Sequence, residues 1–398
     1  MAEQHEKALV PQIRFTGFTD PWEQRKLSDL TDRVSIQSSD SDLPQVEYED
    51  IIPGEGTLNK DLRDKKGGKT GIKFYAGDVL YGKLRPYLMN WLYPQFNGVA
   101  VGDFWVLRAT ECDSSFLYRL VQTGSFQRLA NVSSGSKMPR ADWNLISQSF
   151  FAVPADHAEQ KAIAKGLAEL DTLITLHQRK YDKLCVLKKS MLDKMFPKGG
   201  SLYPEIRFAG FTDPWEQRKL SSTCEQLSRT INPLETPNEE FTEYSMPAFD
   251  NNETAETVIG NSMNSLRKIV DRPCLLVNKL NVRKKRIWHV PRPEANAVCS
   301  SEFVPFSSHS SDLSFIKISL LSERITAYLE SCSSGSSNSQ KRVTPEIIMS
   351  SEIIAPSLAE QRRIGAFFDR LDSLITLHQR KLELLRNIKK SMLDKMFV

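Results

Sequence analysis

The sequence predicts a mixed α/β protein in which two α/β modules are separated by a pair of long antiparallel helices, related by an approximate two-fold axis. Three observations predict this fold. A segment near the N-terminus returns almost unchanged in the middle of the chain, and two segments with helical spacing return as well. Between these constant segments the two halves of the chain differ.

The repeat begins with IRFTGFTDPWEQRKLS, which runs from Ile13 to Ser28 and returns as IRFAGFTDPWEQRKLS from Ile206 to Ser221, 193 residues later. LITLHQRK from Leu173 and KKSMLDKMF from Lys188 both return 201 residues later. Residues from about 29 to 130 and from about 222 to 330 share little. Duplication for stability alone does not explain why near-identity is confined to the edges. We interpret the repeat as a scaffold that holds two modules with different surfaces.

The later constant segments have apolar residues at alternating four- and three-residue steps, the seam of a coiled coil. The first seam comprises Ile163, Leu167, Leu170, Ile174, His177, Tyr181, Leu184, Met191 and Met195, and the second comprises Ile364, Phe368, Leu371, Ile375, His378, Leu382, Leu385, Met392 and Met396. Lys188 and Lys389 interrupt the two seams at the same position. Each helix spans roughly 58 Å. Because the seams match in length and register, we expect the helices to pack against each other.

Helix breakers place the boundaries of these elements. Pro154 and Pro356 precede the helices, and Pro197-Lys198-Gly199-Gly200 ends the first one. We therefore expect a first module over residues 1–155 with residues 1–10 as a loose tail, a helix over 156–197, a linker over 198–205, a second module over 206–356 and a helix over 357–398. Antiparallel pairing also implies that the end of the chain lies beside Ile13.

Within the modules, residues 77–81 and 274–277 have the apolar character of buried strands, and residues 116–129 and 315–329 have helical spacing. The six cysteines include no CxxC pair, so we expect neither a zinc site nor a disulfide framework. The first residues lack the apolar core of a signal peptide, and no apolar stretch approaches the roughly 20 residues that span a bilayer. These features predict a cytoplasmic protein.

The arrangement resembles the specificity subunit of type I restriction-modification systems. The resemblance rests on the opening segment and its copy, on the run GDVLYGKLRPYL from Gly77 to Leu88, and on a Pro followed by Glu-Gln before each helix (Pro154 with Glu159 and Gln160, Pro356 with Glu360 and Gln361). A Leu-Asp pair at 170–171 and 371–372 and a Lys-rich helix end complete the pattern. The order of module then helix, twice, covers essentially the whole chain.

The resemblance implies a DNA-binding protein without catalytic activity, in which each module is a target-recognition domain for one half of a bipartite asymmetric DNA sequence. It implies two modification subunits that methylate adenine with S-adenosylmethionine, and restriction subunits that use ATP and Mg²⁺; no cofactor is expected in this chain itself. The second module departs from the pattern, with Asn278-Lys279-Leu280-Asn281-Val282-Arg283 in place of Gly-Lys-Leu-Arg-Pro. Contact residues therefore transfer less directly to that module.

Candidate DNA contacts come from basic clusters, because affinity for DNA depends largely on neutralised phosphates, and from polar side chains that suit base edges. The net charge of +4 leaves such a surface to local clustering. The candidates are Lys66, Lys69, Lys83, Arg85, Ser136, Lys137, Arg140, Lys279, Arg283, Lys284, Lys285, Arg286, Asn338, Gln340 and Lys341. Six of these lie in the corresponding polar loops 134–140 and 334–342. The alternatives are a solvated charged face for the clusters and surface linkers for the loops.

Two repeated aromatic positions have competing interpretations. His177 and His378 occupy equivalent seam positions and could form a pH-sensitive joint, although a packed, hydrogen-bonded histidine is the more common arrangement. Trp22 and Trp215 could stack on a base, but an anchor between module and helix end suits a residue that both modules share. Metal binding has no supporting carboxylates at ligand spacing.

The motifs of catalysis are missing from the sequence. Asp20-Pro21-Trp22 and its copy lack the second Pro of an adenine methyltransferase active site, and Gly67-Gly68-Lys69-Thr70 lacks the first glycine of a phosphate-binding loop. A single-chain restriction enzyme is therefore disfavoured. The competing function is a coiled-coil scaffold that joins two protein-binding domains without contacting DNA, which the modest net charge and the long seams would suit.

Overall fold

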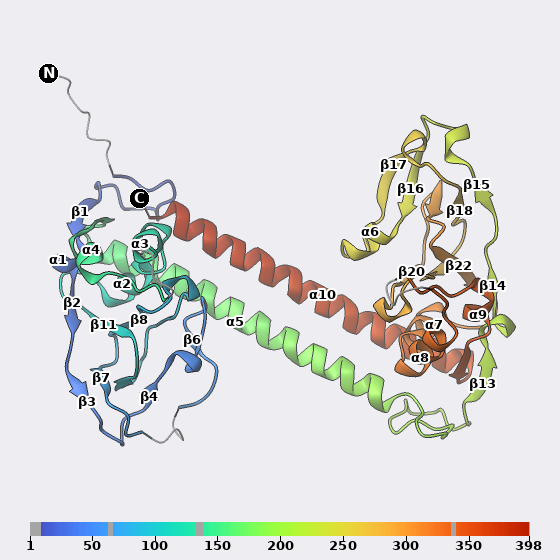
Figure 1. The fold of residues 1–398 in the computed structure, drawn as a ribbon, viewed down its shortest axis with the longest axis horizontal. Helices are drawn as coiled ribbons and strands as arrows, with labels where there is room; N and C mark the ends of the chain where they lie inside the picture. The colour runs from blue at the N-terminus through green and yellow to red at the C-terminus, as the bar shows by residue number, and fades with distance from the viewer. Residues whose placement is uncertain (1–8, 63–66, 133–137, 336–339, 398) are drawn as a thin grey trace. The chain divides into compact units, whose positions relative to one another are not determined.

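The computed structural model describes residues 9–62, 67–132, 138–335 and 340–397, which fall into two compact units (Figure 1). The first unit consists of Met1–Tyr181 and His378–Val398, and the second of Asp182–Leu377. These units differ from the consecutive segments expected from the sequence. Each unit contains one module together with the start of one long helix and the end of the other.

The first module is built on a four-stranded antiparallel sheet and a four-stranded mixed sheet. The strands of the first sheet have the order β2-β11-β8-β9, and those of the second have the order β3-β7-β10-β4. The elements are β1 (Glu23–Lys26), α1 (Leu27–Leu30), β2 (Thr31–Val34), β3 (Gln37–Ser38), β4 (Gln45–Val46), β5 (Ile51–Ile52), β6 (Thr57–Leu58), β7 (Gly71–Phe74), β8 (Val79–Gly82), β9 (Trp91–Leu92), β10 (Gly98–Ala100), β11 (Phe104–Ala109), α2 (Ser114–Leu120), α3 (Gly124–Ala130), α4 (Trp143–Gln148) and β12 (Phe150–Val153).

The second module repeats this plan, with sheet orders β14-β22-β19-β20 and β15-β18-β21-β16-β17. The edge strand β17 makes its second sheet larger by one strand. The elements are β13 (Glu216–Lys219), β14 (Cys224–Gln226), β15 (Thr230–Ile231), β16 (Glu240–Tyr244), α6 (Met246–Asp250), β17 (Glu256–Ile259), β18 (Arg267–Ile269), β19 (Cys274–Asn278), β20 (Ile287–Val290), β21 (Ala297–Cys299), β22 (Phe303–Ser308), α7 (Leu313–Leu320), α8 (Glu323–Ser331), α9 (Pro345–Met349) and β23 (Glu352–Ala355).

The strands expected at residues 77–81 and 274–277 are the buried strands β8 and β19. Each segment expected to be helical is divided into two helices, α2 with α3 and α7 with α8. The division follows from capping: the side chains of Thr123 and Ser322 accept hydrogen bonds from the backbone at the start of α3 and α8. Among the described residues, no helix is both long and apolar enough to cross a membrane.

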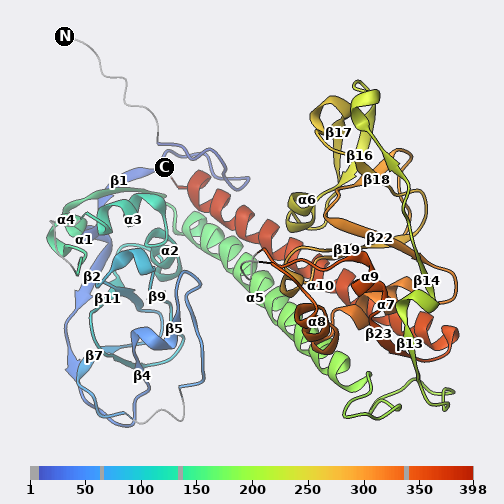
Figure 2. The same ribbon diagram turned by 45° about the vertical axis from the view of Figure 1, so that its right-hand side comes forward.

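The long helices α5 (His157–Lys194) and α10 (Leu358–Lys395) run antiparallel within each unit (Figures 1 and 2). The interruptions of the two seams have a structural reason, because each lysine meets an aspartate of the other helix. Lys389 Nζ lies 2.7 Å from Asp171 Oδ1 in the first unit, and Lys188 Nζ lies 2.5 Å from Asp372 Oδ1 in the second. Charged seam positions of this kind select one register and one orientation.

The seam side chains are the least exposed part of the helices. Leu167, Phe368, Leu371 and Leu382 are buried, and Leu170, Ile174, His177, Tyr181, Leu184, Ile375, His378 and Leu385 are half-buried. In the first unit, the equivalent residues His177 and His378 face each other with their Nδ1 atoms 2.8 Å apart. His177 and His378 are therefore packed and hydrogen-bonded to each other.

The repeated opening segment fastens the two helices together, and we call Ile13–Trp22 and Ile206–Trp215 the helix clips. Arg14 donates two hydrogen bonds of 2.6 and 2.7 Å to Glu159, which is only 2% exposed at the start of α5. The backbone N–H of Ile13 donates to the carbonyl oxygen of Lys395 at the end of α10, at 3.1 Å. One short segment thus holds the start of one helix and the end of the other. The expected proximity of the chain end to Ile13 is confirmed.

The second clip repeats these bonds. Arg207 donates to Glu360 at 2.7 and 2.6 Å, and the N–H of Ile206 donates to the carbonyl oxygen of Lys194 at 2.9 Å. The adjacent Gln160 and Gln361 also act alike, each accepting a hydrogen bond from the backbone N–H of the aspartate that caps α2 or α7. The Glu-Gln pair of each helix therefore ties the helix to the clip and to the module.

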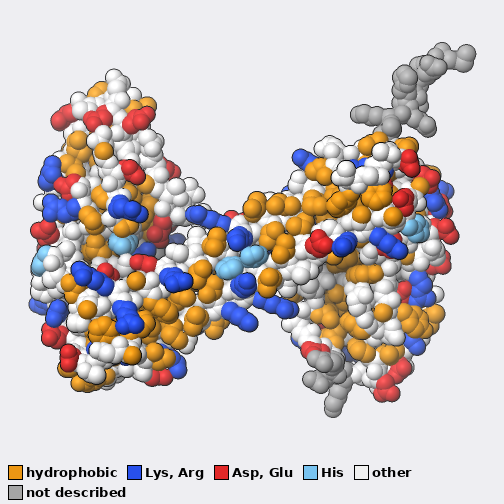
Figure 3. Space-filling view, turned by 180° about the vertical axis from the view of Figure 1, so that it is seen from behind, with side chains coloured by type: hydrophobic (Ala, Val, Ile, Leu, Met, Phe, Trp, Pro, Cys, Tyr) orange, Lys and Arg blue, Asp and Glu red, His pale blue; other side chains and the backbone are white. Residues whose placement is uncertain are grey.

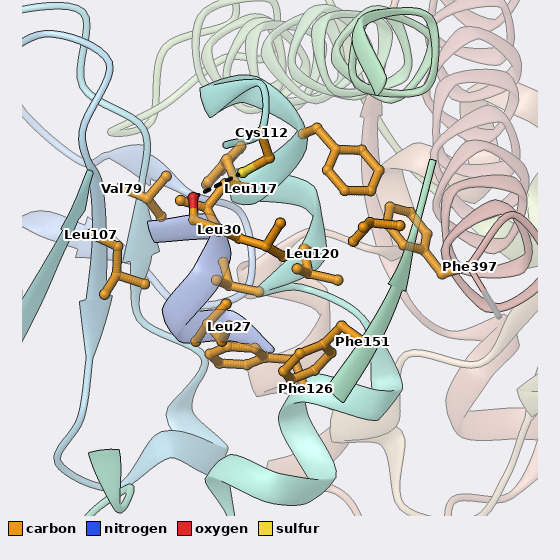
Figure 4. Packing of buried hydrophobic residues seen from close by; sticks show 14 of the residues in the cluster. Leu27, Leu30, Val79, Leu107, Cys112, Leu117, Leu120, Phe126, Phe151 and Phe397 are labelled. Carbon is orange, nitrogen blue, oxygen red and sulfur yellow. Dashed lines mark hydrogen bonds between the residues drawn. The ribbon is translucent and has the colours of Figure 1, made fainter. Parts of the chain in front are cut away.

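Both tryptophans of the clips are buried anchors. Trp22 packs edge-on against Phe397, the second residue after α10, and Phe397 stacks on Phe116 of α2. Figure 4 shows Phe397 in this cluster together with Leu117 and Leu120 of α2. Phe196 makes the same contacts with Trp215 and Phe315 in the second unit. With exposed fractions of 3% and 1%, the two indoles are positioned for packing and not for stacking on a base.

The expectation of a loose tail over residues 1–10 is wrong at its end. Residues 1–8 lie outside the described residues, but Leu9 packs against the core of the first module and its carbonyl oxygen accepts a hydrogen bond from Trp22 N–H at 2.9 Å. Leu9 buries apolar surface beside the clip, so the packed part of the first module begins before Ile13.

The histidine pair predicts a stability that depends on pH. Burial, together with the nearby Lys180 and Lys381, lowers the pKa of both His177 and His378. Because the folded state binds these protons more weakly than the unfolded state, the contribution is present above a pH of about 6.5 and is lost as the pH falls below it. We expect the free energy of unfolding, measured by urea denaturation, to decrease from pH 7 to pH 5. A variant with leucine at both positions should show a flatter profile, and an identical profile would contradict this account.

Candidate nucleic-acid interface

Each module carries a turn in an unusual backbone conformation, directly after the central strand of its antiparallel sheet. In the first module the short 3₁₀ turn Pro86–Leu88 lies between Arg85 and Met89, whose φ angles are 50° and 55°. In the second, Val282–Lys284 lies between Asn281 and Lys285, with φ angles of 52° and 50°. We call residues 85–89 and 281–285 the strained turns, because a left-handed conformation costs a non-glycine residue about 1–2 kcal/mol.

The strained turns have the same conformation although their sequences differ. The departure of the second module from the Gly-Lys-Leu-Arg-Pro pattern therefore changes the side chains of the turn but not its backbone conformation. Asn281 suits its position, since asparagine tolerates the left-handed region better than most residues, whereas Arg85 has no such compensation. Strain of this kind is concentrated at functional sites.

The structure brings each strained turn together with the polar loop that follows later in the sequence. In the first module, Arg85 N–H donates to the carbonyl oxygen of Pro139 at 2.7 Å, and Ala141 N–H donates to that of Lys83 at 2.8 Å. Leu84 and Arg140 form an isolated β-bridge there. The basic cluster and the polar loop of this module thus form one surface.

The second module has the same bridge. Asn281 N–H donates to the carbonyl oxygen of Lys341 at 2.9 Å, Val343 N–H donates to that of Lys279 at 3.1 Å, and Leu280 pairs with Arg342. Two regions about 60 residues apart in sequence are therefore adjacent in both modules. We refer to each strained turn with the described end of its bridged loop, residues 139–141 or 340–343, as a turn–loop site.

An acidic residue beneath each turn–loop site orients an arginine of the loop. Asp103 lies 3.1 Å from Arg140 and 3.5 Å from Lys83, and Glu302 lies 3.0 Å from Arg342. Arg342 is thus the counterpart of Arg140, and the sequence analysis did not single it out. The sequence SSGS, which begins at Ser133 and again at Ser333 and overlaps the start of each loop, could have indicated this correspondence, but the loops differ in length after it.

The first turn–loop site exposes a mixed surface. Tyr87, Leu88 and Met89 are 53%, 40% and 43% exposed. Arg85 is exposed as well, and its guanidinium makes no ion pair within the described chain. A free cation beside an aromatic ring and two apolar side chains is suited to contact both phosphates and bases.

The basic cluster of the second module is largely neutralised within the protein. Arg283 pairs with Glu330 at 2.5 Å, Lys285 with Glu323 at 2.6 Å, and Arg286 donates two hydrogen bonds to Asp250 at 2.8 and 2.6 Å. The bond to Asp250 raises the pKa of Arg286, and the same bond lowers the pKa of Asp250. The side chain of Arg286 is only 13% exposed, so its primary contact is structural.

Two lysines of this basic cluster remain as free cations. Neither Lys279 nor Lys284 makes an ion pair or a side-chain hydrogen bond among the described residues. Figure 3 shows one face of the molecule, where Lys and Arg side chains are scattered among acidic ones over the modules and gather beside the histidines on the helices. The unpaired positive charge of this cluster therefore lies at the strained turn, with Lys284, and just before it, with Lys279.

The remaining candidates fall into three groups. Lys66, Ser136, Lys137 and Asn338 fall outside the described residues. Lys69 pairs with Glu47 at 2.5 Å. Gln340 and Lys341 belong to the second turn–loop site, Lys341 through its carbonyl oxygen.

Comparison with known proteins shows what the chain is similar to. A family described as the type I restriction modification DNA specificity domain matches residues 213–387. This segment of the chain is similar to type I DNA specificity domains. Over 203 residues the chain is 26% identical to the type I restriction enzyme EcoDI specificity subunit of Escherichia coli, and the match covers 48% of this chain and 46% of that protein. The chain thus aligns with about half the length of that relative.

The similarity of fold extends over the whole chain. The crystal structure of the type I restriction-modification S subunit from M. genitalium matches with a TM-score of 0.66 and 13% identity, covering 98% of this chain and 99% of that one. The similarity of fold therefore includes the first module and α5, which lie outside the matched segment 213–387, as well as α10, of which that segment covers only a part.

The left-handed strain at Arg85 predicts that a glycine at this position stabilises the fold. Replacing Arg85 by glycine removes the left-handed strain, so we expect the free energy of unfolding to rise by about 1 kcal/mol. Asn281→Gly is the matched control and should have a smaller effect. Chemical denaturation measures both. If Arg85→Gly is destabilising, the strain assigned to this turn is wrong.

Proposed function

We propose that this chain is the non-catalytic specificity subunit of a type I restriction-modification complex, and that each module recognises one half of a bipartite, asymmetric DNA target. The observation that carries the proposal is the pair of turn–loop sites, which have one backbone conformation and different side chains. The specificity-domain match to residues 213–387 and the shared fold support it.

The difference between the two sites accounts for an asymmetric target. The first turn presents Arg85 with an exposed Tyr87, and the second presents Asn281 with the free Lys284. Arginine suits the paired acceptors of guanine, and asparagine suits adenine, so the two modules would select different bases at corresponding positions. The unpaired lysines would contact phosphates, which position a protein on the duplex without reading it.

The helices offer a repeated surface for the partner subunits that the resemblance implies. Leu176 and Leu377 occupy equivalent positions outside the seam and are 47% and 46% exposed. Leu187 and Ile388 form a second equivalent, exposed pair. A surface that occurs once on each helix suits two copies of one partner, and we assign it to two modification subunits. S-adenosylmethionine would bind to these subunits, and ATP and Mg²⁺ to the restriction subunits.

A scaffold that joins two protein-binding domains is the alternative function. Sequence-specific DNA binding with a steep salt dependence distinguishes a specificity subunit from a scaffold. Each phosphate contact releases counterions, whereas a scaffold that binds only proteins makes no phosphate contacts. The proposal expects the assembled complex to lose DNA affinity steeply as salt is raised.

Variants of the second turn test the assignment of its charges. Replacing Arg283, Lys284 and Arg286 together by alanine should weaken DNA binding of the assembled complex, and flatten the plot of log affinity against log salt by roughly one unit per lost phosphate contact. Because Lys284 is the unpaired member, Lys284→Ala alone should account for much of the change. Arg286→Ala, which breaks the bond to Asp250, should lower thermal stability more than the salt slope. An unchanged slope in the triple variant would show that the cluster is only a solvated face.

The absence of catalytic activity is tested with the purified chain. We expect that the chain alone neither binds S-adenosylmethionine nor methylates DNA, because its sequence carries neither a cofactor loop nor the active-site motif of an adenine methyltransferase. Transfer of a labelled methyl group to DNA should occur only after modification subunits are added. Methylation by the chain alone would contradict the proposal.

A further inference from the structure

The first unit contains a cavity of about 290 Å³ between its module and the two long helices. Gly54 and Thr57 of the β5–β6 hairpin, Met89 and Trp91 lie on the module side. Residues of α5 near Asp171 and of α10 near Lys389 lie on the helix side. All of these residues belong to one compact unit, so the cavity is a feature of that unit alone.

The helix side of the cavity is basic. Arg386, Lys389 and Lys390 line it from one face of α10, since they are three and four residues apart. Asp171 accepts from Lys389 at 2.7 Å and from the buried Arg119 at 2.5 Å, and Arg386 lies 3.3 Å from Glu55. Three cations thus meet two carboxylates, whereas the fourth, Lys390, makes no ion pair with any described residue.

The module side of the cavity holds polar atoms without partners. Trp91 and Gln122 are 4% and 7% exposed, and in the described structure neither Trp91 Nε1 nor Gln122 Oε1 has a hydrogen-bond partner. Arg119 Nε, beside Asp171, has none either. Buried polar atoms are nearly always paired, so an unpaired donor and acceptor on two residues that line one cavity indicate a ligand or ordered water that would complete them.

Apolar side chains complete the lining of the cavity, and a backbone hydrogen bond holds part of that lining in place. Met89, Ile174 and Leu393 line the cavity, and Gly54 N–H donates to the carbonyl oxygen of Met89 at 2.9 Å. In the second module Lys285 takes the position of Met89, and its ammonium reaches the carbonyl oxygen of Leu321 and the carboxylate of Glu323. The shorter, uncharged Met89 makes no such connection, so the two modules differ at this place.

We propose that this cavity binds a small organic phosphate of about mononucleotide size. Arg386, Lys389 and Lys390 would hold the phosphate through charge-assisted hydrogen bonds. The apolar side chains would contact the ring of the ligand, and Trp91 and Gln122 would supply a donor and an acceptor for its polar edge. A volume near the lower end of the usual 300–1,000 Å³ range suits one nucleotide and not a dinucleotide.

Calorimetric titration of the full-length chain without DNA tests the proposal independently of DNA recognition. The probes are adenosine 5′-monophosphate, ribose 5-phosphate and inorganic phosphate. We expect saturable binding of the nucleotide to one site, with weaker binding of the two smaller probes. Absence of saturable binding for all three would overturn the proposal, and equal affinity for inorganic phosphate and nucleotide would overturn the part assigned to the ring.

Matched lysine variants locate the site. Lys390→Gln should weaken nucleotide binding by about tenfold, the size expected for one charge-assisted contact, and Lys390→Arg should restore most of the affinity. Lys189 occupies the equivalent position on α5 and does not line the cavity, so Lys189→Gln should bind like the unmodified chain. Equal weakening by both glutamine variants would indicate non-specific attraction to a basic helix and would overturn the assignment.

Discussion

A buried ion pair between each helix clip and the start of a long helix is the contact on which the rest of the structure depends. Arg14 and Glu159 are removed from water together, as are Arg207 and Glu360. Breaking such a pair by removing one partner typically costs about 3–5 kcal/mol, because it leaves a buried charge alone. The same clip holds the end of the other helix through a backbone hydrogen bond and an aromatic contact. Antiparallel pairing of the helices follows from this arrangement, since one segment can hold both ends only if they are neighbours.

The clips explain which parts of the sequence are repeated. The opening segment docks on helix ends and not on DNA, so its two copies meet the same contacts and are nearly identical. The Lys–Asp pairs of the seam act in the same sense, since each charge placed among apolar residues is satisfied in one register only. Modules held at such ends can differ in their surfaces without any change in the scaffold. The turn–loop sites use this freedom, with one backbone conformation and two sets of side chains.

Much of the architecture could be predicted because it rests on periodicity and repetition. Both long helices, their pairing and the neighbouring chain ends follow from seams that match in length. The partners of individual charges could not be predicted. Glu159 lies 145 residues from Arg14, and nothing in the sequence joins them. The cluster around Arg283 looks like a free basic patch in sequence, yet Glu330, Glu323 and Asp250 come from distant segments and neutralise most of it.

The strained turns were also beyond sequence analysis, for a different reason. A left-handed backbone conformation is usually indicated in a sequence by glycine. Arg85, Met89 and Lys285 are not glycines, so the sequence does not indicate it at these positions. The second turn, which departs from the family pattern in sequence, nevertheless keeps the conformation of the first. Its equivalence is set by the bridge to the polar loop, a contact between residues about 60 positions apart. Conformation at these sites is therefore imposed by tertiary structure and not by local preference.

The distance between the beginning of the first clip and the end of α10 tests the central claim most directly. Spin labels at Val10→Cys and Lys395→Cys, both exposed positions, can be compared in a chain whose two cysteines outside the core, Cys185 and Cys332, are replaced by serine. The clip predicts a short distance, within the reach of the two label side chains. A distance approaching roughly 57 Å, the length of a 38-residue helix, would mean that the helices do not pair antiparallel and would contradict the account.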